Sequence, residues 1–345
     1  MTPRLTRRQL LQYGTFAFGS SIITACAGNP TDPQAEKTPE GLDKITMVTD
    51  WLAQAEHGGF YQALATGIYE KYGLAVTLRM GGPQVSGSQL LLGGVVDFAM
   101  SNSTQAINAV SQKAPIVSVA AMFQKDPRCI IAHPDPAIQD LGDLKGRPIF
   151  VTQASVNDFW GLLANRYGFT DSQRRVYNFN PAPFLADPTS SQQGFITSEP
   201  FTLSKELGTE PIVFLLADYG YTPYATTIDT TRAIIEKKPD VVKRFVQATS
   251  EGWQSYLQDP TPGNELIRTD HPEMPQDLLD YGVSKLKEYG IVNSGDAETN
   301  GIGYMTADRW KGFFDSMVEW GVYETDVPYE SAFVLDFVQD LPKAA

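Results

Sequence analysis

The sequence is poor in cysteine, histidine and positive charge. Its 345 residues include two cysteines and three histidines, and 27 Lys and Arg against 40 Asp and Glu leave a formal net charge of −13. Two cysteines cannot form a disulfide framework or a cysteine-based zinc site, and the scattered histidines lack the spacing of a metal motif. Nucleic-acid binders usually carry a basic balance, so that class is disfavoured, as is attraction to an anionic membrane surface.

Catalytic and phosphate-binding motifs are missing as well. The sequence holds no Gly-x-Ser-x-Gly or His-Glu-x-x-His motif, and its glycine pairs at 81–82 and 93–94 lack the phosphate-cradling GxGxxG or P-loop pattern. His57 has no nucleophile or metal partner paired with it in sequence, so we expect a polar pocket or capping role. We therefore predict no catalytic residue, no metal and no cofactor.

The sequence contains enough hydrophobic residues for a sizeable core, and its N-terminus resembles a targeting signal. Hydrophobic residues make up 42% of a chain long enough for about two domains. Residues 1–25 have a basic start and a short apolar stretch, which predicts an export signal. Within it, Arg7-Arg8 resembles a twin-arginine signal, and Ile23-Thr24-Ala25-Cys26 resembles a bacterial lipobox that would lipidate Cys26. The alternative is a plain cleaved signal. Residues 26–43, rich in Pro, Gly and polar side chains, predict a flexible tether.

The body alternates between strand and helix patterns. Strands are predicted at 44–49, 74–80, 96–100 and 116–122, with helices at 60–72, 88–92 and 104–112 between them. The pattern then restarts, with strands at 129–132, 148–151, 175–178, 194–197 and 212–217 and a helix at 157–167. Beyond residue 230 it becomes helical, at 241–257, 275–289 and 307–320. This order predicts an α/β fold of mostly parallel sheets flanked by helices.

Polar and aromatic side chains gather just after the predicted strands. In open α/β sheets the crevice at the carboxyl ends of the strands is the default ligand site. The candidate ligand-binding residues there are Asp50, Trp51, Glu56, His57, Ser103, Ser155, Asp158, Trp160, Glu199, Asp218 and Tyr221.

Four of the predicted strands are followed by a carboxylate among these candidates, which indicates a ligand rich in N–H donors. The carboxylates are Asp50 or Glu56, Asp158, Glu199 and Asp218. Acids that converge on one pocket repel each other unless a cation or a donor-rich ligand separates them. A planar cation suits them, because carboxylates accept its N–H groups pairwise and aromatic faces add cation–π attraction. Each acid also has a plain structural interpretation: Asp158 as a helix cap, Glu199 in a turn and Asp218 in a hinge loop.

Several segments resemble the substrate-binding proteins of ABC transporters of the sulfonate, nitrate and thiamine-pyrimidine type. The resemblance rests on Asp50-Trp51, on Glu56-His57-Gly58-Gly59-Phe60-Tyr61, on residues 67–74 and on the Asp-Leu-Lys-Gly-like turn at 140–146. It implies a two-lobed periplasmic binding protein of type II with its ligand in the cleft between the lobes. Lobe 1 would comprise residues 44–128 and 225–345, and lobe 2 residues 129–224.

The same resemblance implies partners and a location. A small-molecule solute, an ABC permease and its ATPase would be the partners of a monomer held by a lipid anchor at the periplasmic face of the inner membrane. Carried over from the family, the pocket positions are Asp50, Trp51, Glu56, Ser103, Ser155, Asp158, Glu199 and Asp218.

The acids at these positions favour a cationic ligand. Sulfonate and nitrate binders would need cationic or neutral donors there. Pyrimidine-precursor binders carry Asp-Trp at the first position, as here, but an asparagine-rich stretch where this chain has Gln54-Ala55-Glu56. We therefore expect a guanidine-like nitrogen compound, with an aminopyrimidine as the alternative. A sulfonate or nitrate binder, a lipoprotein sensor without transport and a pyrimidine synthase are less favoured, since the synthases carry a cysteine cluster that this chain lacks.

Overall fold

The computed structural model describes residues 37–343 of the chain. The predicted export signal, Cys26 and most of the predicted tether lie outside the described residues. Of the tether, residues 38–42 form a turn closed by a 2.8 Å hydrogen bond from the Thr38 N–H to the Leu42 carbonyl. The first strand then begins at Asp43, one residue before its predicted start.

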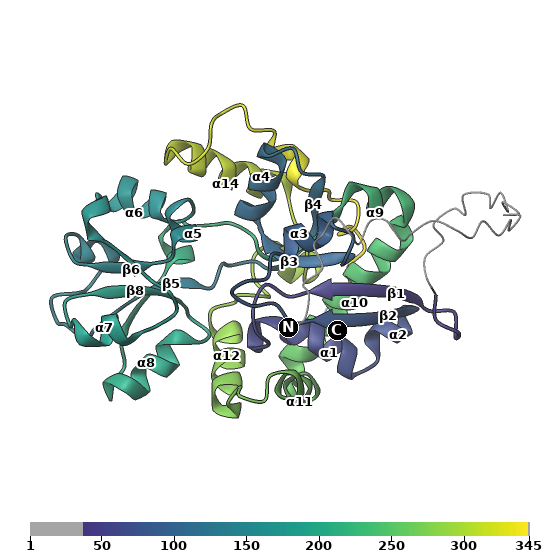
Figure 1. Ribbon diagram of the computed structural model, residues 1–345, viewed down its shortest axis with the longest axis horizontal. Helices are drawn as coiled ribbons and strands as arrows, with labels where there is room; N and C mark the ends of the chain where they lie inside the picture. Colours follow the sequence, from purple (N-terminus) through teal and green to yellow (C-terminus); the bar gives the residue numbers. More distant parts are fainter. Residues whose placement is uncertain (1–36, 344–345) are drawn as a thin grey trace, which may run out of the picture. The chain divides into compact units, whose positions relative to one another are not determined.

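Within residues 37–343, ten strands form two five-stranded sheets (Figure 1). The first sheet has the order β2 (Leu74–Arg79), β1 (Asp43–Val48), β3 (Phe98–Asn102), β10 (Ala225–Thr231) and β4 (Ile116–Phe123). The second has the order β7 (Arg174–Val176), β6 (Ile149–Val151), β8 (Ser191–Phe195), β5 (Arg128–Ala132) and β9 (Ile212–Leu215).

One strand of each sheet runs against the other four. Strand β10 pairs antiparallel with both β3 and β4, and β5 pairs antiparallel with both β8 and β9. The remaining pairings are parallel, with β1 matched to β2 from Asp43 opposite Leu74 to Val48 opposite Arg79. The predicted α/β fold with two sheets is confirmed, but the sheets are mixed, since four of the eight strand pairings are antiparallel. Each reversed strand is the one by which the chain enters its sheet from the other.

Helices surround both sheets (Figure 1). In the first half of the chain these are α1 (Gly58–Ala65), α2 (Ile68–Lys71), α3 (Gly87–Leu92) and α4 (Ser103–Ser111). Next come α5 (Gln153–Val156), α6 (Trp160–Tyr167), α7 (Ala182–Ala186) and α8 (Glu199–Leu207). The helical tail consists of α9 (Arg232–Lys237), α10 (Pro239–Gln258), α11 (Thr261–Asp270), α12 (Gln276–Glu288), α13 (Asp296–Asn300) and α14 (Ala307–Glu319). Between residues 37 and 343, no helix combines the length and the apolar character needed to cross a bilayer.

Two adjacent glycines let α1 pack directly against α10. A Cβ atom on Gly59 would lie 2.2 Å from Cγ of Trp253, and one on Gly58 would lie 2.0 Å from the ring of Tyr256. In return, a Cβ atom on Gly252 of α10 would lie 2.4 Å from the Gly59 carbonyl oxygen. Such close approach leaves no room for any side chain, so the glycine pair after His57 fixes how the first helix docks.

The predicted helix at 60–72 is two helices. The chain turns at Gly67, whose φ of 72° lies in the left-handed region that favours glycine, and α2 starts after it. A 3-10 turn, η1 (Ala55–His57), also precedes α1. The predicted strand at 194–197 lies earlier, at β8 (Ser191–Phe195).

Strand β10 was not predicted because its sequence, Ala-Thr-Thr-Ile-Asp-Thr-Thr, shows no apolar alternation. All seven residues are nevertheless buried. Their polar groups are satisfied inside the sheet: Asp229 accepts hydrogen bonds from the hydroxyls of Ser118 (2.6 Å) and Thr227 (3.0 Å). These hydrogen bonds offset part of the cost of burying polar groups in the sheet.

Two crossovers connect the sheets, and Arg309 of α14 holds both. The first runs through residues 124–127 and the second through residues 220–224. The Arg309 guanidinium donates to the carbonyl oxygens of Gln124 and Pro223 and lies 4.2 Å from the centre of the Tyr224 ring. One side chain thus links the two segments that connect the sheets.

Candidate functional site

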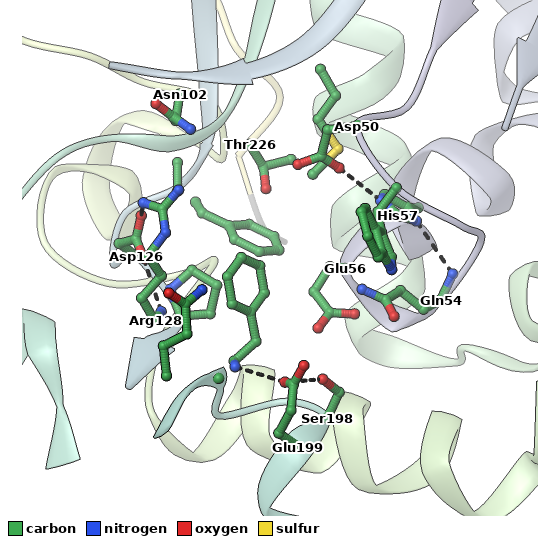
Figure 2. Close-up of a pocket in the computed structure, with 18 of the residues that line it drawn as sticks. Asp50, Gln54, Glu56, His57, Asn102, Asp126, Arg128, Ser198, Glu199 and Thr226 are labelled. Atoms are coloured by element: carbon green, nitrogen blue, oxygen red, sulfur yellow. Dashed lines mark hydrogen bonds and ion pairs between the residues drawn. The ribbon is translucent and has the colours of Figure 1, made fainter. Parts of the chain in front are cut away.

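A cavity of about 510 Å³ lies where strand ends of both sheets meet (Figure 2). The parallel strands contribute the residues that follow them, and the antiparallel strands β5 and β10 contribute the residues at their starts. Its lining is formed by Asp50, Trp51, Gln54, Glu56, His57, Met100, Ser101, Asn102, Gln105, Phe123, Asp126, Pro127, Arg128, Tyr177, Phe179, Gln193, Gly194, Phe195, Ser198, Glu199, Ala225 and Thr226.

Aromatic rings form much of the apolar part of this lining. The rings of Trp51 and Phe179 are 4.7 Å apart between centres, and those of Phe179 and Tyr177 are 5.5 Å apart. Phe179 is 52% exposed and has a φ of 64°, so a large apolar side chain is held toward solvent on a strained backbone. Phe123 and Phe195 line the cavity as well. Contiguous aromatic side chains of this kind, with Phe179 exposed at the rim, are suited to stacking a planar ligand.

Glu56 and Glu199 lie near each other at the cavity (Figure 2). Glu56 is only 2% exposed and accepts a hydrogen bond from the Thr197 hydroxyl, and burial raises the pKa of its carboxyl group. Glu199 accepts from the Phe195 N–H at 2.8 Å and from the Ser198 hydroxyl at 2.6 Å, both to Oε2. The two carboxyl groups therefore stand in fixed positions where they can accept N–H groups from a ligand.

The hydrogen bonds of His57 define its tautomer. Its Nδ1 accepts the backbone N–H of Gln54 at 3.2 Å, so the proton of the neutral ring sits on Nε2. Nε2 then donates to Oδ1 of Asp50 at 3.1 Å (Figure 2). His57 therefore orients Asp50 at the cavity wall, in keeping with the predicted polar pocket role.

Arg128 lies across the cavity from Asp50 and His57, within a cluster of acids (Figure 2). Its Nη1 is 2.8 Å from Oδ2 of Asp126 and 3.2 Å from Oδ2 of Asp158, and it also donates to the Tyr221 hydroxyl at 3.1 Å. Burial lowers the pKa of Arg128, but the two carboxylates outweigh burial and raise it. Burial also raises the pKa of Asp126. This guanidinium is thus charged and already paired.

Five of the predicted ligand-binding residues line the cavity: Asp50, Trp51, Glu56, His57 and Glu199. Three others lie directly behind its wall. Asp158 and Tyr221 hold Arg128 from behind, with the Tyr221 hydroxyl and the Thr104 hydroxyl both donating to Asp158. Ser155 donates at 2.8 Å to the side chain of the lining residue Gln193.

The remaining three candidates do not reach the cavity. Ser103 exchanges hydrogen bonds with the backbone of Tyr224, and its predecessors Ser101 and Asn102 take the lining position. The Trp160 indole donates to Asp171 at 3.1 Å, away from the site. The Asp218 side chain, in the turn after β9, is 52% exposed and lies 3.5 Å from Lys125, outside the cavity lining.

Arg128, Asp126, Thr226 and most of the aromatic lining are absent from the predicted site, which contains residues expected to follow strands. That expectation holds for parallel strands. Strands β5 and β10 run the other way, so their first residues reach the same edge. Asp126-Pro127-Arg128 at the start of the second sheet was the available signal.

Two mixed sheets with a cavity at their strand ends form the periplasmic binding-protein fold. Residues 54–262 match the family described as NMT1/THI5 like, and the chain belongs to that family.

Relatives and solved structures agree with this assignment. The chain is 25% identical over 333 residues to the riboflavin-binding protein RibY of Chloroflexus aurantiacus, covering 92% of this chain and 94% of that protein. It is 21% identical over 287 residues to a formylaminopyrimidine-binding protein of Halalkalibacterium halodurans, covering 79% and 87%. The periplasmic aliphatic sulphonate binding protein SsuA of Escherichia coli has the same fold, with a TM-score of 0.63 at 14% identity over 88% of this chain and 94% of that chain.

Proposed function

We propose that this protein is the solute receptor of an ABC importer and that it captures a planar nitrogen heterocycle bearing N–H groups. The observation that carries the proposal is the pairing of one aromatic surface with two fixed carboxyl groups in a single cavity. Trp51, Tyr177 and Phe179 supply faces on which a flat ring can stack, and Glu56 and Glu199 supply acceptors for its N–H groups.

The size of the cavity favours a heterocycle over a smaller solute. A volume of about 510 Å³ lies within the usual range for sites that enclose a whole organic ligand. A guanidinium ion would occupy a small part of it and leave the aromatic lining wet. The names of two relatives, a riboflavin-binding and a formylaminopyrimidine-binding protein, point to the same chemistry.

A guanidine-like cation is the second candidate. It is supported by the acidic side chains Asp50, Glu56, Asp126 and Glu199 around the cavity, which would attract any compact planar cation. A sulfonate or nitrate ligand is disfavoured by the same acids, even though the fold matches sulfonate-binding proteins.

Capture rather than catalysis is the proposed activity. Two relatives matched over 94% and 87% of their length are named as binding proteins. Matches that cover 31% to 67% of this chain are to 4-amino-5-hydroxymethyl-2-methylpyrimidine phosphate synthases. Cys129, the cysteine of the body, is fully buried with a raised thiol pKa, so it offers no reactive thiolate.

The receptor proposal includes a mode of action. Residues 44–128 with 225–345 and residues 129–224 would form two lobes that close on the solute. Contacts between elements of the two sheets support such closure: the Thr197 hydroxyl donates to Glu56, and Lys205 of α8 is 2.6 Å from Asp277 of α12. A monomer with lipidated Cys26, tethered at the periplasmic face of the inner membrane beside its permease and ATPase, completes the proposal.

A thermal unfolding panel tests it. The purified protein is heated with riboflavin, 4-amino-5-hydroxymethyl-2-methylpyrimidine, guanidine, taurine or nitrate. A ligand at about 100 times its Kd stabilises the folded state by roughly 2.7 kcal/mol, which is a shift of several degrees. We expect a shift with a heterocycle. A shift with guanidine alone would select the second candidate, and a shift with anions alone would refute both.

A further inference from the structure

We propose that the cavity admits only the unphosphorylated form of its heterocyclic ligand, because Arg128 is neutralised by two buried aspartates and cannot receive an anion. This inference rests on the proposed function and names the ligand class more closely. It makes Asp126 and Asp158 specificity-determining residues, although Asp158 lies behind the wall and acts through Arg128.

The contacts of Arg128 show how the neutralisation is built. Asp126 holds the residue twice, by Oδ1 to the backbone N–H at 2.8 Å and by Oδ2 to Nη1 at 2.8 Å. Asp158 holds Nη1 from the other side, at 3.2 Å. Asp126 is 1% exposed, and Asp158 is itself fixed by the hydroxyls of Thr104 and Tyr221. Neither aspartate can swing away to expose the guanidinium without breaking several hydrogen bonds.

The charge balance around the cavity opposes an anion. Among the described residues that line it, Asp50, Glu56, Asp126 and Glu199 are acidic, and Arg128 is the matching strong base. A phosphate would meet these carboxyl groups in a partly dehydrated site, where like charges are strongly unfavourable.

The same arrangement leaves Arg128 able to serve a neutral acceptor. Its side-chain contacts with the acids and with Tyr221 all use Nη1. The other N–H groups of the planar fork can donate to a ring carbonyl oxygen, which needs no net charge from the protein. The site therefore combines carboxylate acceptors on one side with a guanidinium donor on the other, which matches a heterocycle that carries both N–H and C=O groups.

This selectivity requires that a phosphorylated ligand be dephosphorylated before the receptor binds it. A phosphorylated form of the ligand, such as a mononucleotide cofactor, would have to lose its phosphate to a phosphatase outside the cell membrane before this receptor could bind it.

Calorimetric titration with matched ligand pairs tests the inference. The full protein is titrated with riboflavin and flavin mononucleotide, and with 4-amino-5-hydroxymethyl-2-methylpyrimidine and its phosphate. We expect the unphosphorylated member of the bound pair to bind on the order of 100-fold more tightly, or more. Asp126→Asn and Asp158→Asn, which unmask Arg128, should each reduce this ratio by about tenfold by raising affinity for the phosphate. Asp218→Asn removes a surface carboxylate outside the cavity and should leave the ratio unchanged.

The outcomes separate the two proposals. If wild type binds both members of a pair equally, the inference is overturned while the proposed function stands. If it binds neither member of either pair, the proposed function fails. If both variants fold, as judged by circular dichroism, yet keep the wild-type ratio, the neutralised arginine is not the cause and the inference is overturned.

Discussion

Asp229 makes the stability of this protein depend on pH in a direction opposite to that of most carboxylates. It is buried in β10, with the hydroxyls of Ser118, Thr227 and Ser101 as partners, and burial raises its pKa from 3.8 to about 6. Hydroxyl donors offset only part of the cost of removing the charge from water. At roughly 1.36 kcal/mol per pKa unit, the rise corresponds to about 3 kcal/mol.

The sign follows from proton linkage. Between pH 3.8 and about 6 the folded protein keeps the Asp229 proton and the unfolded chain has lost it. The folded state then binds more protons, so the free energy of unfolding falls as pH rises through this range. The contribution of Asp229 is fully present below pH 3.8 and is lost above about pH 6.

Asp229→Asn removes this dependence. Urea unfolding of wild type and variant at about pH 4 and about pH 7 gives a stability difference at each pH. Because part of the effect is already lost at about pH 4, just above the unfolded-state pKa of 3.8, we expect the variant to gain about 2.4 kcal/mol relative to wild type on going to the higher pH. Any hydrogen bond weakened by the amide cancels, because it acts at both pH values. Glu236→Gln on the exposed face of α9 is the control. A wild-type-to-variant difference equal at the two pH values would refute the reasoning.

Three further predictions concern the site and its supports. Glu56→Gln should weaken ligand binding by about 10- to 100-fold, because a charge-assisted hydrogen bond is lost. It should also raise the stability of the unliganded protein at pH 7, because the raised pKa of Glu56 means that its burial costs stability as pH rises above 4.5. Calorimetric titration and urea unfolding check the two effects, and equal or tighter binding would contradict the first. Gly59→Ala, whose methyl would overlap Trp253, should destabilise the protein by about 1–3 kcal/mol, and an unchanged unfolding midpoint would show that α1 can shift. Arg309→Gln should lower the free energy of unfolding by about 1.5–3 kcal/mol, because the carbonyl oxygens of Gln124 and Pro223 lose their charged donor. The surface change Arg268→Gln should leave it unchanged. Equal unfolding midpoints for the two variants would argue against this role of Arg309.

Much of the fold can be predicted from the sequence, because in most strands and helices the buried residues are apolar and recur with the period of the element. Strands such as β4 (Ile116–Phe123), in which every residue is buried, appear as continuous apolar runs. Strand β10 does not, since threonines and an aspartate are buried there by hydrogen bonds that only the assembled sheet provides. The apolar pattern of a sequence identifies elements whose buried residues are hydrophobic, and it does not identify elements whose buried residues are polar.

The candidate site was predictable to the extent that it follows parallel strands. Asp50, Trp51 and Glu56 stand after β1, where the crevice rule places them, and the structure brings them to the cavity. Arg128 is the first residue of an antiparallel strand, and Asp218 is exposed in a 3-10 turn after β9. Strand direction and strand order decide which residues meet at a cavity, and neither is visible in a linear pattern.

The central claim is that an aromatic and acidic cavity binds a planar heterocycle, and titration of one variant tests it most directly. The heterocycle that stabilises wild type in the thermal panel is titrated by calorimetry into wild type, Trp51→Ala and the surface control Leu92→Ala, which is 51% exposed and outside this cavity. Stacking on an aromatic side chain contributes about 1–3 kcal/mol per ring, so Trp51→Ala should lose at least about fivefold in affinity while the control matches wild type. Equal affinities for all three proteins would contradict the account, because the ligand would then bind somewhere other than against Trp51.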